Sequence, residues 1–183
     1  MTVEETKLDG CFILKPQLFT DSRGYFFESF NQKKFENATG ANGHFVQDNQ
    51  SASVYGVVRG LHFQNGMHAQ AKLVRVIEGR VLDVAVDIRK DSKTFGQWVS
   101  IELSADNNWQ FYIPRGFAHG FSVLSESAIF AYKCDNEYNK ESEGGIRYND
   151  PSLAIDWGVP AEKMIISDKD ILLPFLNENL STL

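Results

Sequence analysis

The sequence predicts an all-β fold in which short antiparallel strands form a sandwich or a barrel. Two observations support this prediction. Between residues 54 and 133, apolar runs recur roughly every ten residues, and turn-forming residues separate them. The segment 81–88 also alternates with the period of a strand, and four apolar residues share one of its faces: Leu82, Val84, Val86 and Ile88. Regular spacing and alternation together are typical of a β-sandwich or barrel.

Length and composition indicate one globular domain, residues 1–183, in which 43% of residues are hydrophobic and 23% are charged. No window approaches about 18 consecutive apolar residues, so no membrane-spanning helix is expected. The first residues lack the basic and apolar regions of a signal peptide, so none is expected. Cys11 and Cys134 lie far apart, which suits a reducing cytoplasm and argues against a zinc ribbon. A net charge of -6 without a long basic run argues against duplex nucleic acid as a partner.

The first 53 residues contain few strand signals. An apolar run at 11–14 stops before Pro16, the cluster 21–24 predicts a turn, and residues 25–30 predict a strand. Residues 31–39 predict one short helix, which ends at Gly40. The segment 43–53 is polar, and we expect it to be irregular.

The remaining strands are expected downstream of Val57-Val58, which leads into Arg59-Gly60. They occupy residues 72–77, 81–88, 97–103, 109–113, 121–124 and 128–133, with turns at 78–80 and 105–108. In the segment 97–103 the inward residues are expected to be Val99, Ile101 and Leu103. Polar loops and turns beyond residue 135 predict an irregular and short-helical cover over residues 139–183.

A rigid turn at Pro114 precedes His119, and an apolar run follows at residues 121–124. The pattern Pro114-x-Gly116-x-x-His119 resembles the second half of the signature of cupin barrels. The expected fold is therefore a cupin-type jelly-roll β-barrel with a few short peripheral helices. Metal-binding cupins also carry a His-x-His pair, whereas His62 and His68 are too far apart to form an i, i+2 pair. The ligand set is incomplete, so no metal is expected.

His62 is a candidate base. Arg59 and Lys72 place positive charge near its imidazole, an arrangement that suits an anionic or enolate-forming ligand. The alternative is an inert, hydrogen-bonded histidine at a strand end. Asp170 could orient this imidazole, as a third group often holds a base, or could form a solvated charge pair with Lys169.

Two tyrosines are candidates of a different kind. Tyr132 could donate a proton inside a dry pocket, or could be a core tyrosine whose hydroxyl reaches the rim. Tyr138 could stack on the ring of a ligand, or could be an exposed loop aromatic.

A series of segments resembles the dTDP-4-dehydrorhamnose 3,5-epimerase family from about Phe19 to Leu173. Each segment alone is weak evidence, but their order along the chain is specific. They are Asp21–Glu28, Gln47–Asn49, Arg59–Gln64, Lys72–Val76, Phe95–Trp98, Ile113–Phe121, Tyr132–Cys134 and Ser167-x-Lys169-Asp170. Phe63 stands where the family often has Tyr, which keeps the aromatic ring.

The resemblance implies a metal-free, cofactor-free cytoplasmic isomerase of dTDP-L-rhamnose biosynthesis. This enzyme would epimerise C3 and C5 of dTDP-4-dehydro-6-deoxy-D-glucose to give dTDP-4-dehydro-L-rhamnose. His62 would be the proton acceptor with Asp170 as its partner, Tyr132 the proton donor on the opposite face of the sugar, and Lys72 the cation at the enolate oxygen. The implied contacts to the nucleotide sugar are Phe19, Arg23, Phe26, Glu28, Gln47, Asp48, Asn49, Arg59, His119, Tyr138, Glu143 and Lys169.

The resemblance also implies a homodimer whose N-terminal strands reach the neighbouring sheet. Phe19, Arg23, Phe26 and Glu28 would then serve the partner's pocket, and Tyr138 would stack on the thymine. The chemistry is consistent with the residues, because a C4 ketone acidifies C3 and C5 and a nearby cation stabilises the enolate. It needs no nicotinamide, and the chain has no GxGxxG loop.

Several alternatives remain open from the sequence. A 3-only or 5-only epimerase would use the same base and acid on another deoxysugar. A ketoisomerase of the same barrel class is less well supported, because the base, acid and carboxylate set of an epimerase is complete. A non-catalytic sugar-nucleotide-binding cupin would need the pocket without the acid and base. A metal-dependent cupin oxygenase would need a ligand that the chain lacks.

Overall fold

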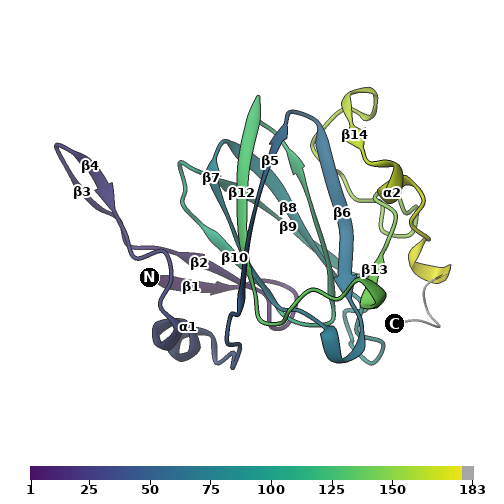
Figure 1. The fold of residues 1–183 in the computed structure, drawn as a ribbon, viewed down its shortest axis with the longest axis horizontal. Helices are drawn as coiled ribbons and strands as arrows, with labels where there is room; N and C mark the ends of the chain where they lie inside the picture. Colours follow the sequence, from purple (N-terminus) through teal and green to yellow (C-terminus); the bar gives the residue numbers. More distant parts are fainter. Residues whose placement is uncertain (179–183) are drawn as a thin grey trace.

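Two antiparallel β-sheets face each other in the computed structural model, which describes residues 1–178 (Figure 1). The first sheet, in spatial order, contains β1 (Thr2–Glu5), β2 (Phe12–Lys15), β10 (Gln110–Ile113), β7 (Lys72–Glu78), β12 (Ser127–Cys134) and β5 (Gln47–Val54). The second contains β13 (Glu143–Gly145), β6 (Val57–Gln64), β11 (Phe117–Val123), β8 (Arg80–Asp87) and β9 (Trp98–Ser104). The predicted all-β jelly-roll class is confirmed, although the sheets do not close into a continuous barrel.

The remaining elements are short and peripheral. A hairpin of β3 (Phe19–Asp21) and β4 (Gly24–Phe26) precedes helix α1 (Gln32–Thr39). Strand β14 (Ile165–Ile166) pairs in parallel with β6, and helix α2 (Asp168–Ile171) follows it. Four 3-10 turns are η1 (Gly66–His68), η2 (Lys140–Ser142), η3 (Ala161–Lys163) and η4 (Leu176–Glu178). Residues 179–183 of the expected C-terminal cover lie outside the described residues, and no helix within residues 1–178 is long and apolar enough to cross a membrane.

The main core lies between the two sheets. Val74 and Phe130 from the first sheet meet Val81 and Phe121 from the second, and all four side chains are buried. The rings of Phe121 and Phe130 stack with centroids 4.2 Å apart. The prediction that Val99, Ile101 and Leu103 point inward is confirmed, because all three belong to this cluster.

Strand β8 is buried on both faces. Val84 and Val86 point away from the main core and pack under the C-terminal segment, against Ile146 and Trp157. The opposite face of β8 carries Val81 and Ala85 into the space between the sheets. Asp83, which shares that inner face, is therefore also fully buried.

The prediction that residues 43–53 are irregular is wrong for most of that segment, because residues 47–54 form β5. Exposure alternates along this strand, and the less exposed row consists of Gln47, Asn49, Ser51 and Ser53. This edge strand has a polar inner row as well as a largely exposed outer row. The hydrophobic alternation that normally reveals a strand is therefore missing from its sequence.

Two other predicted boundaries also differ. The strand expected at 25–30 covers only 24–26, where it pairs with β3 across the predicted turn at 21–24. The strand expected at 121–124 begins earlier, at Phe117, and all seven residues of β11 are buried. His119 and Gly120 interrupt its apolar pattern, and the sequence therefore conceals its first half.

Helix α1 begins and ends as its sequence predicts. The Asn31 side chain accepts a hydrogen bond from the backbone N–H of Lys34, and Gly40 adopts a left-handed conformation with φ 70° at the C-terminus. The buried ring of Phe35 anchors the helix edge-on against Tyr112, with centroids 5.0 Å apart.

The backbones of β6 and β11 approach each other closely at two glycines. A Cβ on Gly60 would lie 2.6 Å from the Cα of Gly120, and a Cβ on Gly120 would lie 2.6 Å from the carbonyl oxygen of Arg59. The strand register shifts here, because His119 pairs with His62 whereas Phe121 pairs with Arg59. The extra residue on β6 forms a bulge, which lets Arg59 and His62 lie on the same side of the strand.

Replacing Gly120 with Ala is therefore expected to destabilise the fold by about 1–3 kcal/mol, because the new methyl group would clash with the backbone of β6. Chemical denaturation of the two proteins measures this loss. Gly43→Ala is the matched control, since the nearest atom to a Cβ there, apart from its chain neighbours, would be the Cβ of Asp135 at 3.7 Å. Equal stability of Gly120→Ala and Gly43→Ala would contradict the steric argument.

Candidate active site

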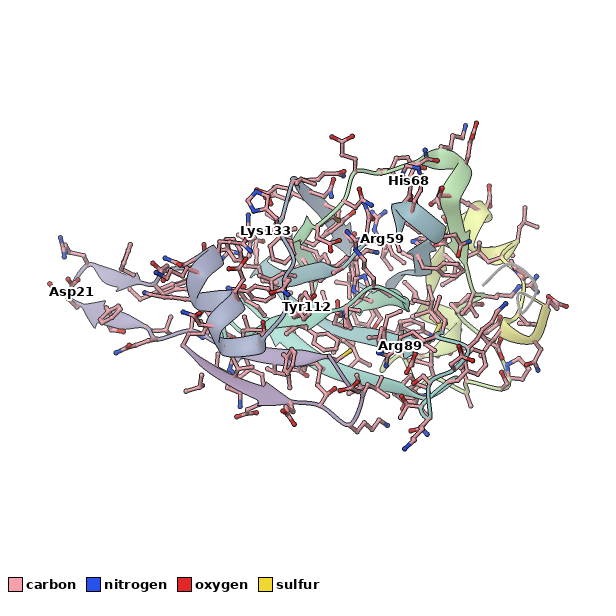
Figure 2. The ribbon with its side chains drawn as sticks, turned by 90° about the horizontal axis from the view of Figure 1, so that it is seen from below. Asp21, Arg59, His68, Arg89, Tyr112 and Lys133 are labelled. Atoms are coloured by element: carbon pink, nitrogen blue, oxygen red, sulfur yellow. The ribbon has the colours of Figure 1, made fainter. Side chains whose placement is uncertain are left out.

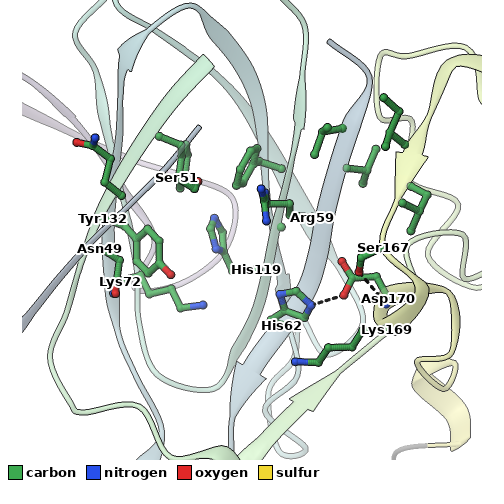
Figure 3. A pocket seen from close by; sticks show the side chains of 18 residues that line it. Asn49, Ser51, Arg59, His62, Lys72, His119, Tyr132, Ser167, Lys169 and Asp170 are labelled. Carbon is green, nitrogen blue, oxygen red and sulfur yellow. Dashed lines mark hydrogen bonds and ion pairs between the residues drawn. The ribbon is translucent and has the colours of Figure 1, made fainter. Parts of the chain in front are cut away.

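A cavity of about 610 Å³ lies between the two sheets (Figure 3). Strand β6 and the segment around α2 form one wall, and β5, β7 and β12 form the other. The titratable side chains predicted to be catalytic all line it, together with His119 and Arg59: His62, Lys72, Tyr132 and Asp170.

His62 is held by Asp170. Its Nε2 lies 2.7 Å from Asp170 Oδ1, and the other carboxylate oxygen accepts a hydrogen bond from the backbone N–H of Gly60 at 3.2 Å. Ser167 caps the first turn of α2 by accepting from the Asp170 N–H, which fixes where the carboxylate lies. His62 is inside β6, and not at its end.

The Asp170 carboxyl is charged at neutral pH. Burial acts to raise its pKa, but the hydrogen bonds from His62, Gly60 and Ser167, and the charge of the imidazole when it is protonated, lower the pKa below the usual value. An ionised carboxylate only accepts hydrogen bonds, so the proton of the neutral imidazole belongs on Nε2. The lone pair of Nδ1 is then available to act as a base.

Tyr132 and Lys72 face His62 from the opposite wall (Figure 3). They come from the adjacent strands β12 and β7, and the Lys72 Nζ lies 6.0 Å from the centre of the Tyr132 ring. Burial raises the pKa of the Tyr132 phenol, which therefore keeps its proton at neutral pH. Burial lowers the pKa of Lys72, which forms no ion pair with any residue of the described part of the chain.

His119 lies behind these groups and is bonded to Asp83. Its Nε2 is 2.9 Å from Asp83 Oδ2 and 3.0 Å from Oδ1, and both side chains are almost completely buried. Burial raises the pKa of Asp83 and lowers that of His119, and each residue opposes the shift of the other. Among residues 1–178, no group of three or more His, Cys, Asp or Glu side chains is arranged to hold a metal ion.

A second cavity, of about 300 Å³, adjoins the first and shares four residues with it: Asn49, His62, Lys72 and Tyr132. It extends to Gln47, Tyr138 and Glu143. The Tyr138 hydroxyl donates to Glu143 Oε2 at 3.0 Å, and Lys169 forms an ion pair with Glu143 Oε1 at 2.5 Å. The backbone N–H of Tyr138 donates to the side chain of Gln47, and this hydrogen bond links the backbone of Tyr138 to β5.

The structure does not bring every expected contact residue to this cavity. Phe19, Arg23 and Phe26 lie on the β3–β4 hairpin, which projects away from the sheets in two perpendicular views (Figures 1 and 2). Arg23 is paired with Asp21 near the hairpin turn, and Glu28 is paired with Lys34. Asp48 points to the outer face of β5, where it pairs with Lys133 at 2.8 Å, so its side chain does not line the cavity.

The fold and the site can now be compared with known proteins. A family model described as dTDP-4-dehydrorhamnose 3,5-epimerase matches residues 5–178. The chain belongs to this family. A curated relative of that name from Shigella flexneri is 54% identical over 171 residues, covering 93% of each protein.

Several solved structures are also similar to this chain. The dTDP-4-dehydrorhamnose 3,5-epimerase from Elizabethkingia anophelis is 60% identical, with a TM-score of 0.94 and 97% coverage of each chain. A Legionella pneumophila epimerase in complex with dTDP-4-keto-L-rhamnose is 51% identical, with a TM-score of 0.93 and coverage of 96% of this chain and 93% of that one. A 3'-monoepimerase from Streptomyces bikiniensis is more distant, at 30% identity and a TM-score of 0.89, with coverage of 97% and 89%.

The sequence did not reveal two polar residues next to this epimerase site. Asp83 lies on the face of segment 81–88 opposite its four apolar residues, and the sequence does not show that this face is also buried. Ser53 lay in a segment that was expected to be irregular, yet its hydroxyl accepts a hydrogen bond from Arg59. The available signal for Asp83 is an acidic residue inside an otherwise apolar strand. Such a carboxylate is buried and needs a polar partner, which indicates a histidine or a cation nearby.

Asp83→Leu is expected to destabilise the protein by about 1–3 kcal/mol, because it leaves the buried imidazole of His119 without its partner. The double variant Asp83→Leu/His119→Phe removes both polar groups and is expected to recover part of that loss. Chemical denaturation of the wild type, both single variants and the double variant measures the coupling. Additive losses would show that the two side chains do not depend on each other.

Proposed function

We propose that this chain, as an isomerase of its family, epimerises dTDP-4-dehydro-6-deoxy-D-glucose at C3 and C5, giving dTDP-4-dehydro-L-rhamnose for dTDP-L-rhamnose biosynthesis. The observation that carries this proposal is a base and an acid on opposite walls of one cavity, namely His62 with Asp170 and Tyr132. The relatives named 3,5-epimerases, and the bound dTDP-4-keto-L-rhamnose in the Legionella structure, support the choice of substrate.

Each inversion is a proton removal followed by a proton return. Nδ1 of His62 takes the proton from the carbon next to the C4 ketone, and the electron pair of that C–H bond forms a C=C bond while the ketone becomes an enolate. Tyr132 then gives its phenolic proton to the opposite face of the carbon, which restores the ketone with inverted configuration. The two side chains return to their starting forms by proton exchange with solvent, and the same cycle serves C3 and C5.

Lys72 is proposed to stabilise the enolate. Burial disfavours its charged form, and no carboxylate pairs with it among residues 1–178. An enolate oxygen that forms beside the ammonium group would supply the missing negative charge. Because this charge develops during the reaction, the interaction is stronger in the transition state than in the ground state.

The nucleotide sugar is proposed to occupy the two adjoining cavities around the part that they share. Gln47, Asn49, Glu143 and Lys169 are placed to contact it, Tyr138 to stack on the thymine, and His119 to contact the sugar. Arg59 is proposed to bind the diphosphate, since a guanidinium group matches phosphate oxygens in a two-point contact.

We further propose a homodimer in which the β3–β4 hairpin of one copy completes the cavity of the other. Two side chains at the base of the hairpin, Phe19 and Phe26, are 56% and 70% exposed. Large exposed aromatics on an isolated two-stranded hairpin are unfavourable unless another surface covers them. In the dimer, Phe19, Arg23, Phe26 and Glu28 would reach the partner's nucleotide.

The cytoplasm is the proposed site of action. Cys11 and Cys134 are both buried and neither forms a disulfide. Free thiols of this kind are typical of proteins from a reducing compartment.

The function is tested by incubation with dTDP-4-dehydro-6-deoxy-D-glucose in deuterated water. Deuterium is expected at both C3 and C5, and nuclear magnetic resonance locates it. Label at one carbon alone would restrict the enzyme to a 3-only or 5-only epimerase, the alternative that the 30% identical 3'-monoepimerase keeps open. Binding without any label would indicate a non-catalytic sugar-nucleotide-binding protein.

Two substitutions separate the base from the acid. His62→Ala is expected to abolish deuterium uptake at C3 and C5, whereas Tyr132→Phe is expected to retain some uptake and lose the inverted product. The difference arises because proton removal needs the imidazole, and proton return to the opposite face needs the phenol. Near-normal exchange by His62→Ala, or full epimerisation by Tyr132→Phe, would refute the assigned roles.

Mixing two variants that are expected to be inactive tests whether the hairpin of one subunit completes the cavity of the other. His62→Ala lacks the base but has an intact hairpin, and Arg23→Ala lacks the hairpin cation but has an intact base. Mixed dimers are expected to regain activity, because one of their two cavities receives both groups. No gain after the subunits have exchanged, with dimers verified by sedimentation, would exclude a contribution of Arg23 across the interface.

A further inference from the structure

Arg59 differs from most other arginines of the chain in its partners. Four arginines in the described residues form ion pairs with carboxylates, namely Arg23, Arg80, Arg89 and Arg115. Arg59 forms no ion pair there, and its one hydrogen bond runs from Nε to the hydroxyl of Ser53 at 3.1 Å. No carboxylate of residues 1–178 is therefore paired with its positive charge beside the cavity (Figure 3).

The identity of the atom that is bonded matters for ligand binding. The bond to Ser53 uses Nε and leaves both terminal NH₂ groups of Arg59 without a partner in the described residues. Two neighbouring N–H groups of a guanidinium form the fork that binds phosphate oxygens. A hydroxyl can thus fix the orientation of this side chain and leave its positive charge unpaired. A carboxylate in the same place would pair with that charge.

Ser53 is suited to hold another side chain and not to contact a ligand. It lies on the inner row of β5, is only 9% exposed, and is absent from the residues that line the cavity. Its strand is paired along its whole length with β12, where Ser53 lies opposite Ala128. The hydroxyl is therefore on a fixed element, whereas the Arg59 side chain is long and more than one-third exposed.

We propose that Ser53 is a positioning residue that holds the guanidinium group of Arg59 ready for the diphosphate of the nucleotide sugar. The proposal rests on the proposed role of Arg59 in binding this diphosphate. Ordering a long side chain before the ligand arrives removes an entropic cost from binding. The effect concerns affinity, since neither Ser53 nor Arg59 takes part in the proton transfers.

A double-mutant cycle on dTDP binding tests the proposal, with dissociation constants from calorimetry for the wild type, Ser53→Ala, Arg59→Ala and the double variant. Arg59→Ala is expected to weaken dTDP binding roughly 10- to 100-fold, as for a hydrogen-bonded charge pair. Ser53→Ala is expected to weaken it about 3- to 10-fold, with the loss in turnover assays found in KM more than in kcat. In the Arg59→Ala background, loss of the hydroxyl is expected to change nothing further.

Ser127→Ala is the matched control, because Ser127 lies on the neighbouring strand β12, outside both cavities, and is exposed. It is expected to bind dTDP like the wild type. Wild-type affinity of Ser53→Ala, or an equal loss with and without Arg59, would overturn the positioning role and leave the proposed function intact. Wild-type affinity of Arg59→Ala would instead refute the diphosphate contact, and with it the role of Ser53.

Discussion

The close contact between Gly60 of β6 and Gly120 of β11 determines where the reactive side chains lie. At this contact the register shifts by one residue, so that Arg59 and His62, three positions apart, both line the cavity. A regular strand would send them to opposite faces. The same bend leaves the N–H of Gly60 free to bond to Asp170, which also holds His62. One steric constraint thus positions Arg59 and His62, the proposed phosphate-binding cation and the proposed base, on the same wall.

The titratable side chains of the cavity fall into two groups: histidines bonded to carboxylates, and cations without a carboxylate partner. Both histidines in the cavity are bonded to buried carboxylates, Asp170 and Asp83, which fix the ring orientation of each. Two cations of the cavity, Lys72 and Arg59, have no carboxylate partner within residues 1–178, and they are the side chains proposed to meet the enolate and the diphosphate. For Lys72, burial disfavours the charged form, and an anionic group of the ligand or of the transition state would offset this cost.

Much of this arrangement could be predicted from the sequence, and the failures share one physical cause. Alternation revealed β8 and β9, because each has one mainly apolar face: the face of β8 under the C-terminal segment and the inner face of β9. It failed for β5 and for the first half of β11, where the row facing the cavity carries polar residues or glycine. A strand that lines a polar site loses the hydrophobic period by which strands are found. The partners Asp83 and Ser53 were missed for the same reason, because they become meaningful only when the facing strand is known.

The two adjoining cavities leave one place for the reacting sugar. They share Asn49, His62, Lys72 and Tyr132, whereas Tyr138 and Glu143 line only the smaller cavity and Arg59 lines only the larger one. The sugar must lie in the shared region for the proposed base and acid to reach its two faces. His62 lies on β6 and Tyr132 on β12, in different sheets, so their separation depends on how the sheets pack. The Phe121–Phe130 stack joins β11, which pairs with β6, to β12 across the core and thereby supports the spacing between His62 and Tyr132.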